Sequence, residues 1–425
     1  MSGIVESKIK AKDGEEQRTI EDNEKKIPRL RFPGFTDAWE QRKLSDVAGV
    51  YDGVHQTPAY QDEGIMFLSV ENIATLTSEK YISEEAYDRD YKVRPEKGDI
   101  LMTRIGDVGT PNVVETSEKL AYYVSLALLK PKGIDSYFLN NAIQSSSFQH
   151  GLRERTLLTA IPMKINKDEI GKVDISYPTN KDEQRKIGES FKQLDNLITL
   201  HQRKCDKLKV YKKGCLQKMF PCHGKNVPEI RFPGFTDDWE QRKLSELFEE
   251  RHVFTKITEK YPRLSFTIEE GVISPEDRKT NKRDFLMKDE ANKKFLITEV
   301  GDIIYNPANV VFGAIHRNSL QNGCLSPIYR IFVTQQDSRF MECVVRSPLF
   351  ISKLAQRTEG SVVKLKTLKP EAFLDMDVNI APTTEEQAKI AEYIYSIDNL
   401  ITLHQRKREA LKRLKAYMLQ NMFPH

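Results

Sequence analysis

The chain has 425 residues, of which 66 are Lys or Arg and 62 are Asp or Glu, for a formal net charge of +4. This length allows two ordinary domains, and 30% charged with 39% hydrophobic residues is typical of a globular protein. No apolar run approaches the roughly 18 residues of a membrane span, and five cysteines without CxxC spacing indicate a reducing cytoplasm, no disulfide framework and no metal site.

The first 27 residues mix Lys, Glu, Asp and Arg and contain no apolar core. They are therefore not a secretory signal. We predict a mobile, charged leader at 1–27, and the alternative is a short helix that docks a partner.

One framework then occurs twice, about 200 residues apart. RFPGFTDAWEQRKLS at 31–45 returns at 231–245 with a single substitution, and DNLITLHQRK at 195–204 returns unchanged at 398–407. The stretches in between share little beyond a Gly-Asp-Ile step. A repeat of this size predicts two domain-sized units, because solenoid repeats are much shorter.

The repeated opening segment predicts a turn followed by an aromatic anchor. Pro33 fixes φ and Gly34 tolerates a positive φ, which together favour a turn. Phe32, Phe35 and Trp39 predict an aromatic clamp that seats the domain, and base stacking is the alternative function.

The two unlike inserts, 46–177 and 246–381, predict mixed α/β domains. In both inserts, short strand-like runs alternate with turns and short helical stretches. The runs are residues 65–70, 99–103, 122–129, 295–298, 302–305 and 328–334.

A long helix closes each copy, at about 181–219 and 384–422. Asn180 and Thr383 can cap these helices, with Glu183 and Glu386 three residues later as in a capping box. A Phe-Pro step ends each helix. Apolar residues three and four apart predict a coiled-coil-like seam, made of Ile187, Phe191, Leu194, Ile198, Leu208, Ile390, Ile394, Ile397, Ile401 and Leu411.

Charge favours an antiparallel pairing of these helices. The C-terminal half of the first has seven basic residues and one acidic residue, and that of the second has six and one. The N-terminal halves are neutral or acidic, so only an antiparallel pair avoids placing basic beside basic. We predict an internal pseudo-twofold and five parts: a leader at 1–27, globular domains at 28–180 and 222–383, a central spacer helix at 181–221 and a C-terminal spacer helix at 384–425.

No catalytic constellation is recognisable in the sequence. A Walker-type phosphate loop is absent, and Tyr305-Asn306-Pro307-Ala308 lacks the second Pro and the aromatic residue of an amino-methyltransferase motif. Two globular domains on a rod of roughly 60 Å suit a long repetitive ligand such as duplex DNA. Basic and amide side chains of the insert loops are the candidate DNA contacts: Lys92, Arg94, Arg104, Asn112, Arg153, Arg155, Lys164, Arg278, Lys279, Lys282, Arg283, Asn306, Asn309, Arg317, Arg357, Lys364 and Lys366.

These features resemble the specificity subunit (HsdS) of type I restriction–modification systems. The resemblance covers nearly the whole chain after residue 27. It is carried by the two RFPGFTD-x-WEQRKLS openings, the Gly98 and Gly301 steps, the TNKDEQRKI and TTEEQAKI helix starts and the duplicated LDNLITLHQRK-type helices. The RFPGF form is similar to that of Gram-positive, especially staphylococcal, subunits.

The resemblance implies a non-catalytic subunit with two target-recognition domains, each of which reads one half of an asymmetric bipartite sequence in double-stranded DNA. The helices would dock two modification (methyltransferase) subunits that use S-adenosylmethionine to methylate adenine. Restriction (translocase/nuclease) subunits would add ATP- and Mg-dependent cleavage. A free-standing bivalent DNA-binding regulator is the main alternative, and a self-sufficient methyltransferase is a second one.

Overall fold

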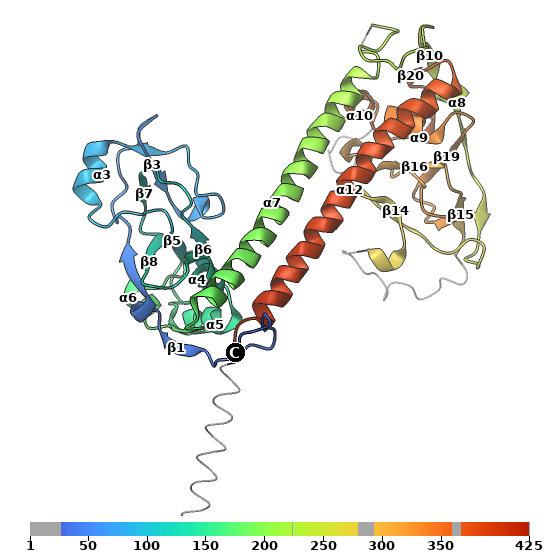
Figure 1. Ribbon diagram of the computed structural model, residues 1–425. Coiled ribbons are helices and arrows are strands. Elements are labelled where there is room, and N and C mark those ends of the chain that lie inside the picture. The colour runs from blue at the N-terminus through green and yellow to red at the C-terminus, as the bar shows by residue number, and fades with distance from the viewer. Residues whose placement is uncertain (1–26, 223, 279–292, 359–366, 425) are drawn as a thin grey trace, which may run out of the picture. The chain divides into compact units, whose positions relative to one another are not determined.

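A computed structural model describes residues 27–222, 224–278, 293–358 and 367–424 (Figure 1). The predicted leader, apart from Ile27, lies outside the described residues. The chain divides into two compact units, Met1–Gln202 with Gln405–His425, and Arg203–His404. Each unit therefore contains half of each long helix, whereas the sequence-based division treated the helices as separate parts.

Two sheets form the core of the first unit. One has the strand order β2-β8-β5-β6 and the other β4-β3-β7. Ile100 and Met102 of β5 point into one hydrophobic core and Leu101 points into another, because successive side chains of a strand face opposite ways. The bounds are β2 (Ala48–Asp52), β3 (Ile65–Leu68), β4 (Tyr81–Ile82), β5 (Ile100–Ile105), β6 (Asp107–Val113), β7 (Leu120–Tyr122) and β8 (Leu126–Pro131).

Short helices pack around these sheets. The side chain of Asp135 accepts a hydrogen bond from the Phe138 amide at the start of one helix, and Ser145 caps the next in the same way through the Phe148 amide. The helices are α2 (Leu44–Val47), α3 (Glu84–Asp90), α4 (Ser136–Ile143), α5 (Ser146–Arg155) and α6 (Lys167–Gly171), with a 3-10 turn at Val70–Asn72.

The second unit repeats this plan with different side chains. Its four-stranded sheet has the order β11-β19-β16-β17 and its three-stranded sheet the order β12-β15-β18. The bounds are α8 (Leu244–Leu247), β11 (Phe248–Glu250), β12 (Phe254–Thr255), β13 (Ser265–Thr267), β14 (Gly271–Ile273), β15 (Phe295–Thr298), β16 (Ile303–Tyr305), β17 (Ile315–Arg317), β18 (Gly323–Leu325), β19 (Arg330–Thr334), α9 (Ser338–Val345), α10 (Pro348–Gln356) and α11 (Pro370–Leu374), with 3-10 turns at Pro275–Asp277 and Val310–Phe312. The predicted mixed α/β class is confirmed.

The duplicated opening segment joins each insert to its long helix. β1 (Glu40–Lys43) pairs antiparallel with β9 (Asp174–Tyr177), and β10 (Glu240–Lys243) pairs with β20 (Asp377–Ile380) in the same register. Gly34 has φ +96°, as the predicted turn requires. Trp39 is buried and makes edge contacts with Phe138 and Phe423, so the predicted aromatic anchor is confirmed for this residue.

A buried ion pair fixes the opening segment to the helix start in both units. Arg31 donates from Nε and Nη2 to the two carboxylate oxygens of Glu183, at 2.7 and 2.8 Å. Arg231 and Glu386 make the same contacts at 2.7 and 2.9 Å. Asn180 does cap the helix, since its side chain accepts from the Glu183 amide at 3.3 Å. The predicted capping-box role of the Glu183 carboxylate is wrong, because that carboxylate binds Arg31.

The long helices are α7 (Lys181–Lys218) and α12 (Thr384–Asn421), each within one residue of its predicted end. In the first unit, Asp195 pairs with Lys415 at 2.7 Å and Gln202 accepts from Arg408. In the second unit, Lys212 pairs with Asp398 at 2.7 Å. Residue numbers rise along one helix as they fall along the other, so the predicted antiparallel pairing is confirmed.

The predicted seam residues lie along the long helices, and most of them belong to the hydrophobic core of their own unit. In the first unit, Ile187, Phe191 and Leu194 are buried in the hydrophobic core that also contains Ile100 and Met102, and Leu411 is partly buried against it. Those of the second unit join the corresponding core, with Ile390, Ile394, Ile397 and Ile401 buried and Leu208 partly buried. Ile198 is half-buried.

Candidate nucleic-acid interface

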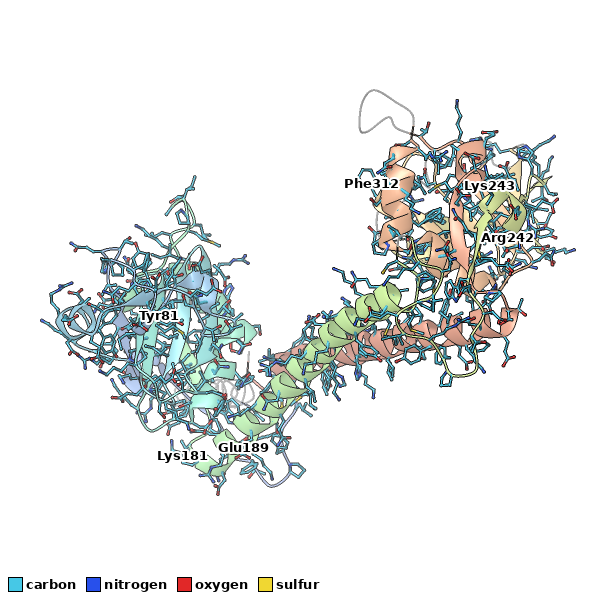
Figure 2. The ribbon with its side chains drawn as sticks, turned by 90° about the horizontal axis from the view of Figure 1, so that it is seen from above. Tyr81, Lys181, Glu189, Arg242, Lys243 and Phe312 are labelled. Atoms are coloured by element: carbon cyan, nitrogen blue, oxygen red, sulfur yellow. The ribbon has the colours of Figure 1, made fainter. Side chains whose placement is uncertain are left out.

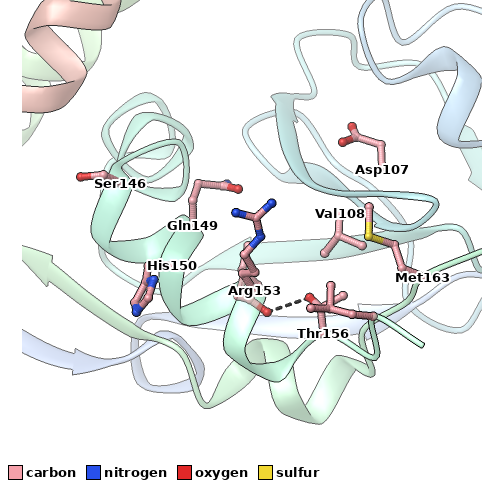
Figure 3. Close-up of a pocket in the computed structure, with 10 residues that line it drawn as sticks. Asp107, Val108, Ser146, Gln149, His150, Arg153, Thr156 and Met163 are labelled. Carbon is pink, nitrogen blue, oxygen red and sulfur yellow. Dashed lines mark hydrogen bonds between the residues drawn. The ribbon is translucent and has the colours of Figure 1, made fainter. Parts of the chain in front are cut away.

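In the first unit, two of the predicted DNA-contacting loops come together. The turn between β5 and β6 meets the loop that follows α5, and an open hollow of about 510 Å³ lies between them (Figure 3). Its lining includes Asp107, Gln149, Arg153, Leu158 and Met163. The sequence had suggested residues 104–112 and 153–164 as separate loops, and the fold joins them in one surface.

Arg153 is the most available hydrogen-bond donor of this hollow. Its side chain is exposed and makes no hydrogen bond or ion pair within the described residues. Gln149, one helical turn earlier on the same face of α5, is fixed because its amide donates to the carbonyls of Gly109 and Ile143 at 2.7 and 2.8 Å. Gly109 has φ +96°, and a Cβ there would lie 2.8 Å from Leu152, so a glycine is needed for this close approach.

On the opposite side of the hollow, Asp107 supplies an acceptor. One carboxylate oxygen accepts from the Thr110 hydroxyl at 2.6 Å, which fixes the turn and leaves the exposed side chain with further acceptor capacity. A free guanidinium and a carboxylate at one concave surface can recognise donor and acceptor groups on a base edge.

The remaining predicted residues of this unit differ in availability. Lys164 and Lys92 are exposed. Arg94 pairs with Asp88 at 2.6 Å, Arg155 donates to the Gly151 carbonyl at 3.1 Å, and Asn112 donates to the Ile73 carbonyl at 2.8 Å. These last three side chains are therefore partly occupied within the domain.

Arg104 does not reach the surface. Only 5% of it is exposed. Its guanidinium donates to the Ile165 carbonyl at 3.0 Å and to the Asp52 carboxylate. The donors of this buried arginine are used inside the domain, and we therefore remove Arg104 from the candidate contacts.

The second unit has a junction at the corresponding place. The Leu368 amide donates to the Pro307 carbonyl at 3.1 Å, as the Ile165 amide donates to the Arg104 carbonyl at 3.0 Å in the first unit. Asn306 lies in this turn and its side chain accepts from the Ala308 amide at 3.1 Å. Asn309 is half-buried beside it.

Other predicted residues of the second unit have partners or lie outside the description. Arg317 donates to the Ser338 hydroxyl at 2.8 Å, and Arg357 donates to Asp375 at 3.0 Å. Arg278 is half-buried. Five predicted residues lie outside the described residues: Lys279, Lys282, Arg283, Lys364 and Lys366.

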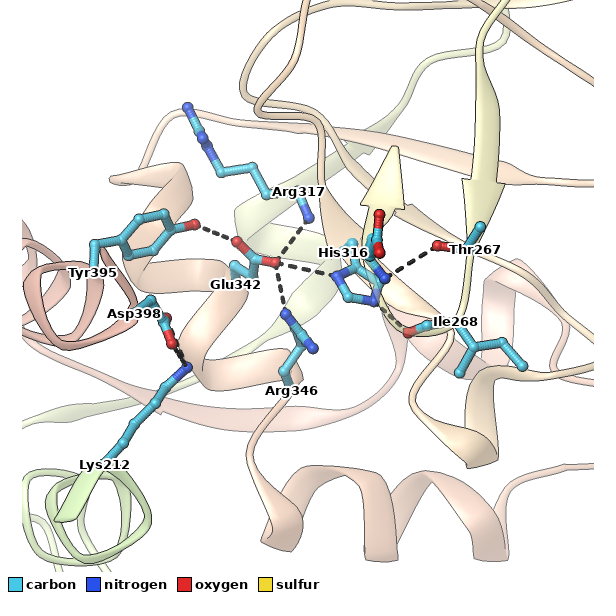
Figure 4. A network of polar contacts seen from close by, with 10 residues as sticks. Lys212, Thr267, Ile268, His316, Arg317, Glu342, Arg346, Tyr395 and Asp398 are labelled. Atoms are coloured by element: carbon cyan, nitrogen blue, oxygen red, sulfur yellow. Dashed lines mark hydrogen bonds and ion pairs between the residues drawn. The ribbon is translucent and has the colours of Figure 1, made fainter. Parts of the chain in front are cut away.

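A buried polar network connects α12 to the second domain (Figure 4). Glu342 accepts from the Arg317 amide and from Arg346, both at 3.2 Å, and from the Tyr395 hydroxyl of α12. Burial lowers the pKa of the neighbouring His316 and raises the pKa of Tyr395, so both side chains are neutral near pH 7.

The first unit makes this connection with different residues. Lys192 of α7 donates to the Tyr137 hydroxyl at 2.5 Å and pairs with Glu115 at 3.0 Å. Lys192 and Tyr395 occupy equivalent positions of the two helices. The backbone of the two helices is therefore repeated, whereas the side chain at this position differs and contacts the domain of its own unit: Lys192 in the first and Tyr395 in the second.

Sequence reasoning missed the helix face that carries Gln149, because the candidate residues were chosen from loops. The spacing of Gln149 and Arg153 was a usable signal, since residues four apart lie on one face of a helix. The apolar residues within 157–163 were a second usable signal.

The part of the chain that the structure describes contains neither a metal-binding cluster nor a membrane-spanning helix. Within those residues, no group of three or more His, Cys, Asp or Glu side chains is arranged to hold a metal ion. None of the described helices is both long and apolar enough to cross a membrane.

Comparison with known proteins agrees with this architecture. Residues 36–210 match the family of the type I restriction modification DNA specificity domain. The chain is 26% identical to the type I restriction enzyme MjaVIII specificity subunit of Methanocaldococcus jannaschii over 62% of its length, which spans 64% of that relative. It is 23% identical to the putative MjaX specificity subunit of the same organism, over 93% of this chain and 94% of that one.

The fold has a solved counterpart. The crystal structure of the type I restriction–modification S subunit from M. genitalium superimposes with a TM-score of 0.63 at 12% identity, covering 94% of this chain and 99% of that one. Over residues 36–210 the chain is similar in sequence to this family, and over nearly its whole length it shares the fold of the M. genitalium S subunit.

Proposed function

We propose that each unit reads one half of an asymmetric, bipartite sequence in double-stranded DNA, and that α7 and α12 set the spacing of the halves. The observation that carries this proposal is the junction described above. The same backbone framework occurs in both units, yet one junction presents Arg153 and Asp107 and the other presents Asn306 and Asn309. Unlike surfaces on like frameworks suit a target whose two halves differ.

In the proposed complex, the helices bind two modification (methyltransferase) subunits. S-adenosylmethionine, ATP and Mg belong to the modification and restriction subunits, and the specificity subunit directs adenine methylation and DNA cleavage by choosing the site. We place the complex in the cytoplasm. The duplicated RFPGF opening supports a form like that of Gram-positive, staphylococcal systems.

Affinity purification of the full chain from its host, followed by sequencing of modified adenines, tests the proposal. We expect methyltransferase subunits to co-purify, and we expect a methylated motif with two unlike halves. Recovery of DNA without any methyltransferase subunit would favour the free-standing regulator. Methylation of DNA by the purified chain alone would contradict the non-catalytic assignment.

The identical decapeptides of the two helices supply a surface for those subunits. Leu197 and Leu200 on α7 are 43% and 44% exposed, and Leu400 and Leu403 on α12 are both 45% exposed. Exposed leucine pairs at equal positions of a duplicated sequence indicate two equal docking sites, because exposed apolar clusters mark interaction surfaces.

We expect the paired substitution Leu197→Asp and Leu200→Asp to remove one methyltransferase subunit of the two, since a buried carboxylate without a partner destabilises an interface. Adding Leu400→Asp and Leu403→Asp should remove the second. Native mass spectrometry measures the stoichiometry. Gln217→Asp at an exposed position of α7 is the control and should retain both subunits, and full retention by the quadruple variant would contradict the assignment.

Arg153 is the side chain of the first hollow that we expect to read a base. Arg153→Ala should weaken specific binding by about 1–3 kcal/mol and relax one position of one half-site, because a bidentate arginine–guanine contact contributes that much discrimination. Binding selection on a randomised first half-site measures both effects. A uniform loss of affinity for all sequences would instead assign Arg153 to a phosphate.

A further inference from the structure

A projecting apolar loop borders the hollow of the first unit. The segment Leu157–Met163 contains four large apolar side chains that water reaches: Ile161 is fully exposed, Leu158 is 60% exposed, and Leu157 and Met163 are 48% and 40% exposed. Isolated exposed apolar residues are ordinary, but four within seven residues form a patch, and such patches mark binding surfaces.

The base of this loop is held in place by backbone hydrogen bonds. The Leu157 amide donates to the Lys164 carbonyl and the Gly106 amide donates to the Met163 carbonyl, both at 2.8 Å. The Ile165 amide continues the attachment to the Arg104 carbonyl at 3.0 Å. The loop is therefore fixed to the β5–β6 turn and presents its tip from a defined position, so little conformational entropy remains to be lost when the tip binds.

The charges beside the loop indicate what kind of partner covers it. Residues 156–163 contain no charged side chain, whereas 153–167 contain four basic residues and one acidic residue. Arg153 and Lys164 stand exposed at its two ends, and neither side chain has an ion-pair partner within the described residues. An apolar tip between two cations fits a partner with an anionic rim and an apolar interior, which describes the phosphates and stacked bases of duplex DNA.

The second unit carries an exposed apolar side chain at the corresponding junction. Phe312 ends the 3-10 turn Val310–Phe312 and is 58% exposed (Figure 2). This turn follows Pro307, which accepts the backbone hydrogen bond equivalent to that of Arg104. Both junctions thus carry an exposed apolar group, from the loop after α5 in the first unit and from the β16–β17 connection in the second.

We propose that these groups are wedges: on binding, Ile161 inserts between adjacent bases of the first half-site, and Phe312 does so in the second. The inference rests on the proposed DNA-reading function and adds local unstacking of the duplex to it. Insertion of an apolar side chain has the cost of unstacking a base step, and burial of the side chain and the additional contacts of the deformed DNA offset that cost. Specificity at such a step arises from how readily it unstacks, without a hydrogen bond to either base.

The test uses the full chain assembled with its methyltransferase subunits, and a duplex of the methylated motif carrying 2-aminopurine at successive positions of each half. We expect fluorescence to rise severalfold at one step in each half when the wild-type complex binds. Ile161→Ala should abolish the rise in the first half only and Phe312→Ala in the second half only, with affinity lowered roughly tenfold. Both side chains are exposed, so neither change is expected to affect folding, and Ile27→Ala at an exposed position is the neutral control.

The outcomes separate the wedge from the proposed function. Specific binding with quenched fluorescence at every position overturns the wedge and leaves the DNA-reading function intact. Loss of a methyltransferase subunit from the Ile161→Ala complex, with unstacking unchanged, overturns the wedge in favour of a protein contact. Absence of sequence-specific binding by the wild-type complex overturns both.

Discussion

Replacing residues 46–177 with the corresponding segment of a type I restriction–modification specificity subunit is expected to change one half of the methylated motif and leave the other half and the spacer unchanged. The exchanged segment contains the whole β5–β6 turn, α5 and the loop to Lys164, and therefore every proposed base contact of the first unit. The segment that we propose to set the spacing, α7, is retained. Sequencing of modified adenines in a strain that lacks the native subunit gives the result directly.

The reciprocal exchange of 246–381 is the matched control and should change only the other half. Both exchanges also affect the polar contacts between each long helix and its globular domain. A first domain without Tyr137 and Glu115 leaves Lys192 unpaired, and a second domain without Glu342 leaves Tyr395 unpaired. Matching the helix residue to the new domain should then raise the yield of folded protein, and a motif that changes in both halves would refute the assignment of one domain to one half.

Glu183→Ala is expected to lower the free energy of unfolding of the first unit by about 3–5 kcal/mol. The carboxylate is almost fully buried and pairs with a guanidinium that is itself 11% exposed. Removing one partner of a buried ion pair leaves the other charge without compensation, which is the costly case. Urea unfolding followed by hydrogen exchange, resolved by peptide, measures the effect in each unit separately.

The duplicated framework supplies the control within the same chain. Glu386→Ala removes the equivalent partner of Arg231 and also the acceptor of the Trp239 indole at 3.3 Å, so it should destabilise the second unit in the same way and spare the first. Arg42→Ala, which removes an exposed ion pair with Glu40, should leave both units unchanged because exposed pairs contribute little. Equal loss in both units from Glu183→Ala would show that the units unfold together.

Local sequence signals predicted the long helices well. Their starts follow from Asn180 and Thr383, whose side chains accept hydrogen bonds from the backbone amides three residues later, at 3.3 Å in both helices. Their ends precede the Phe-Pro steps. The antiparallel pairing followed from charge alone. These features depend on neighbours in sequence or on a regular repeat, which is why one sequence sufficed.

The shared architecture of the inserts was harder to predict, because it depends on few positions. The sequences of the two inserts share only the Gly-Asp-Ile step. Nevertheless, Asp135 and Asp337 cap equivalent helices, as do Ser145 and Ser347. These caps lie 202 residues apart in both cases and were a usable signal. The division into units could not be predicted from linear boundaries, since each unit takes residues from both long helices.

The candidate contacts illustrate the limit of local reasoning most clearly. Arg104 and Arg153 are equally basic, and both lie at the edge of a predicted loop. Arg104 is buried because Asp52, far away in sequence, lies beside it, whereas no acidic side chain among the described residues pairs with Arg153. Availability is a property of tertiary neighbours, which a single sequence does not specify.

The division of the helices also determines the order in which the chain can fold during synthesis. The second unit is a continuous stretch, Arg203–His404, while the first needs Gln405–His425, whose Met422 and Phe423 are buried against Trp39 and Phe191. The first unit therefore cannot complete its core until residues 405–425 emerge from the ribosome. The second unit can fold before that point, although it is synthesised later. A premature stop codon after residue 404 would thus damage the first unit, which is made earlier, and spare the second unit.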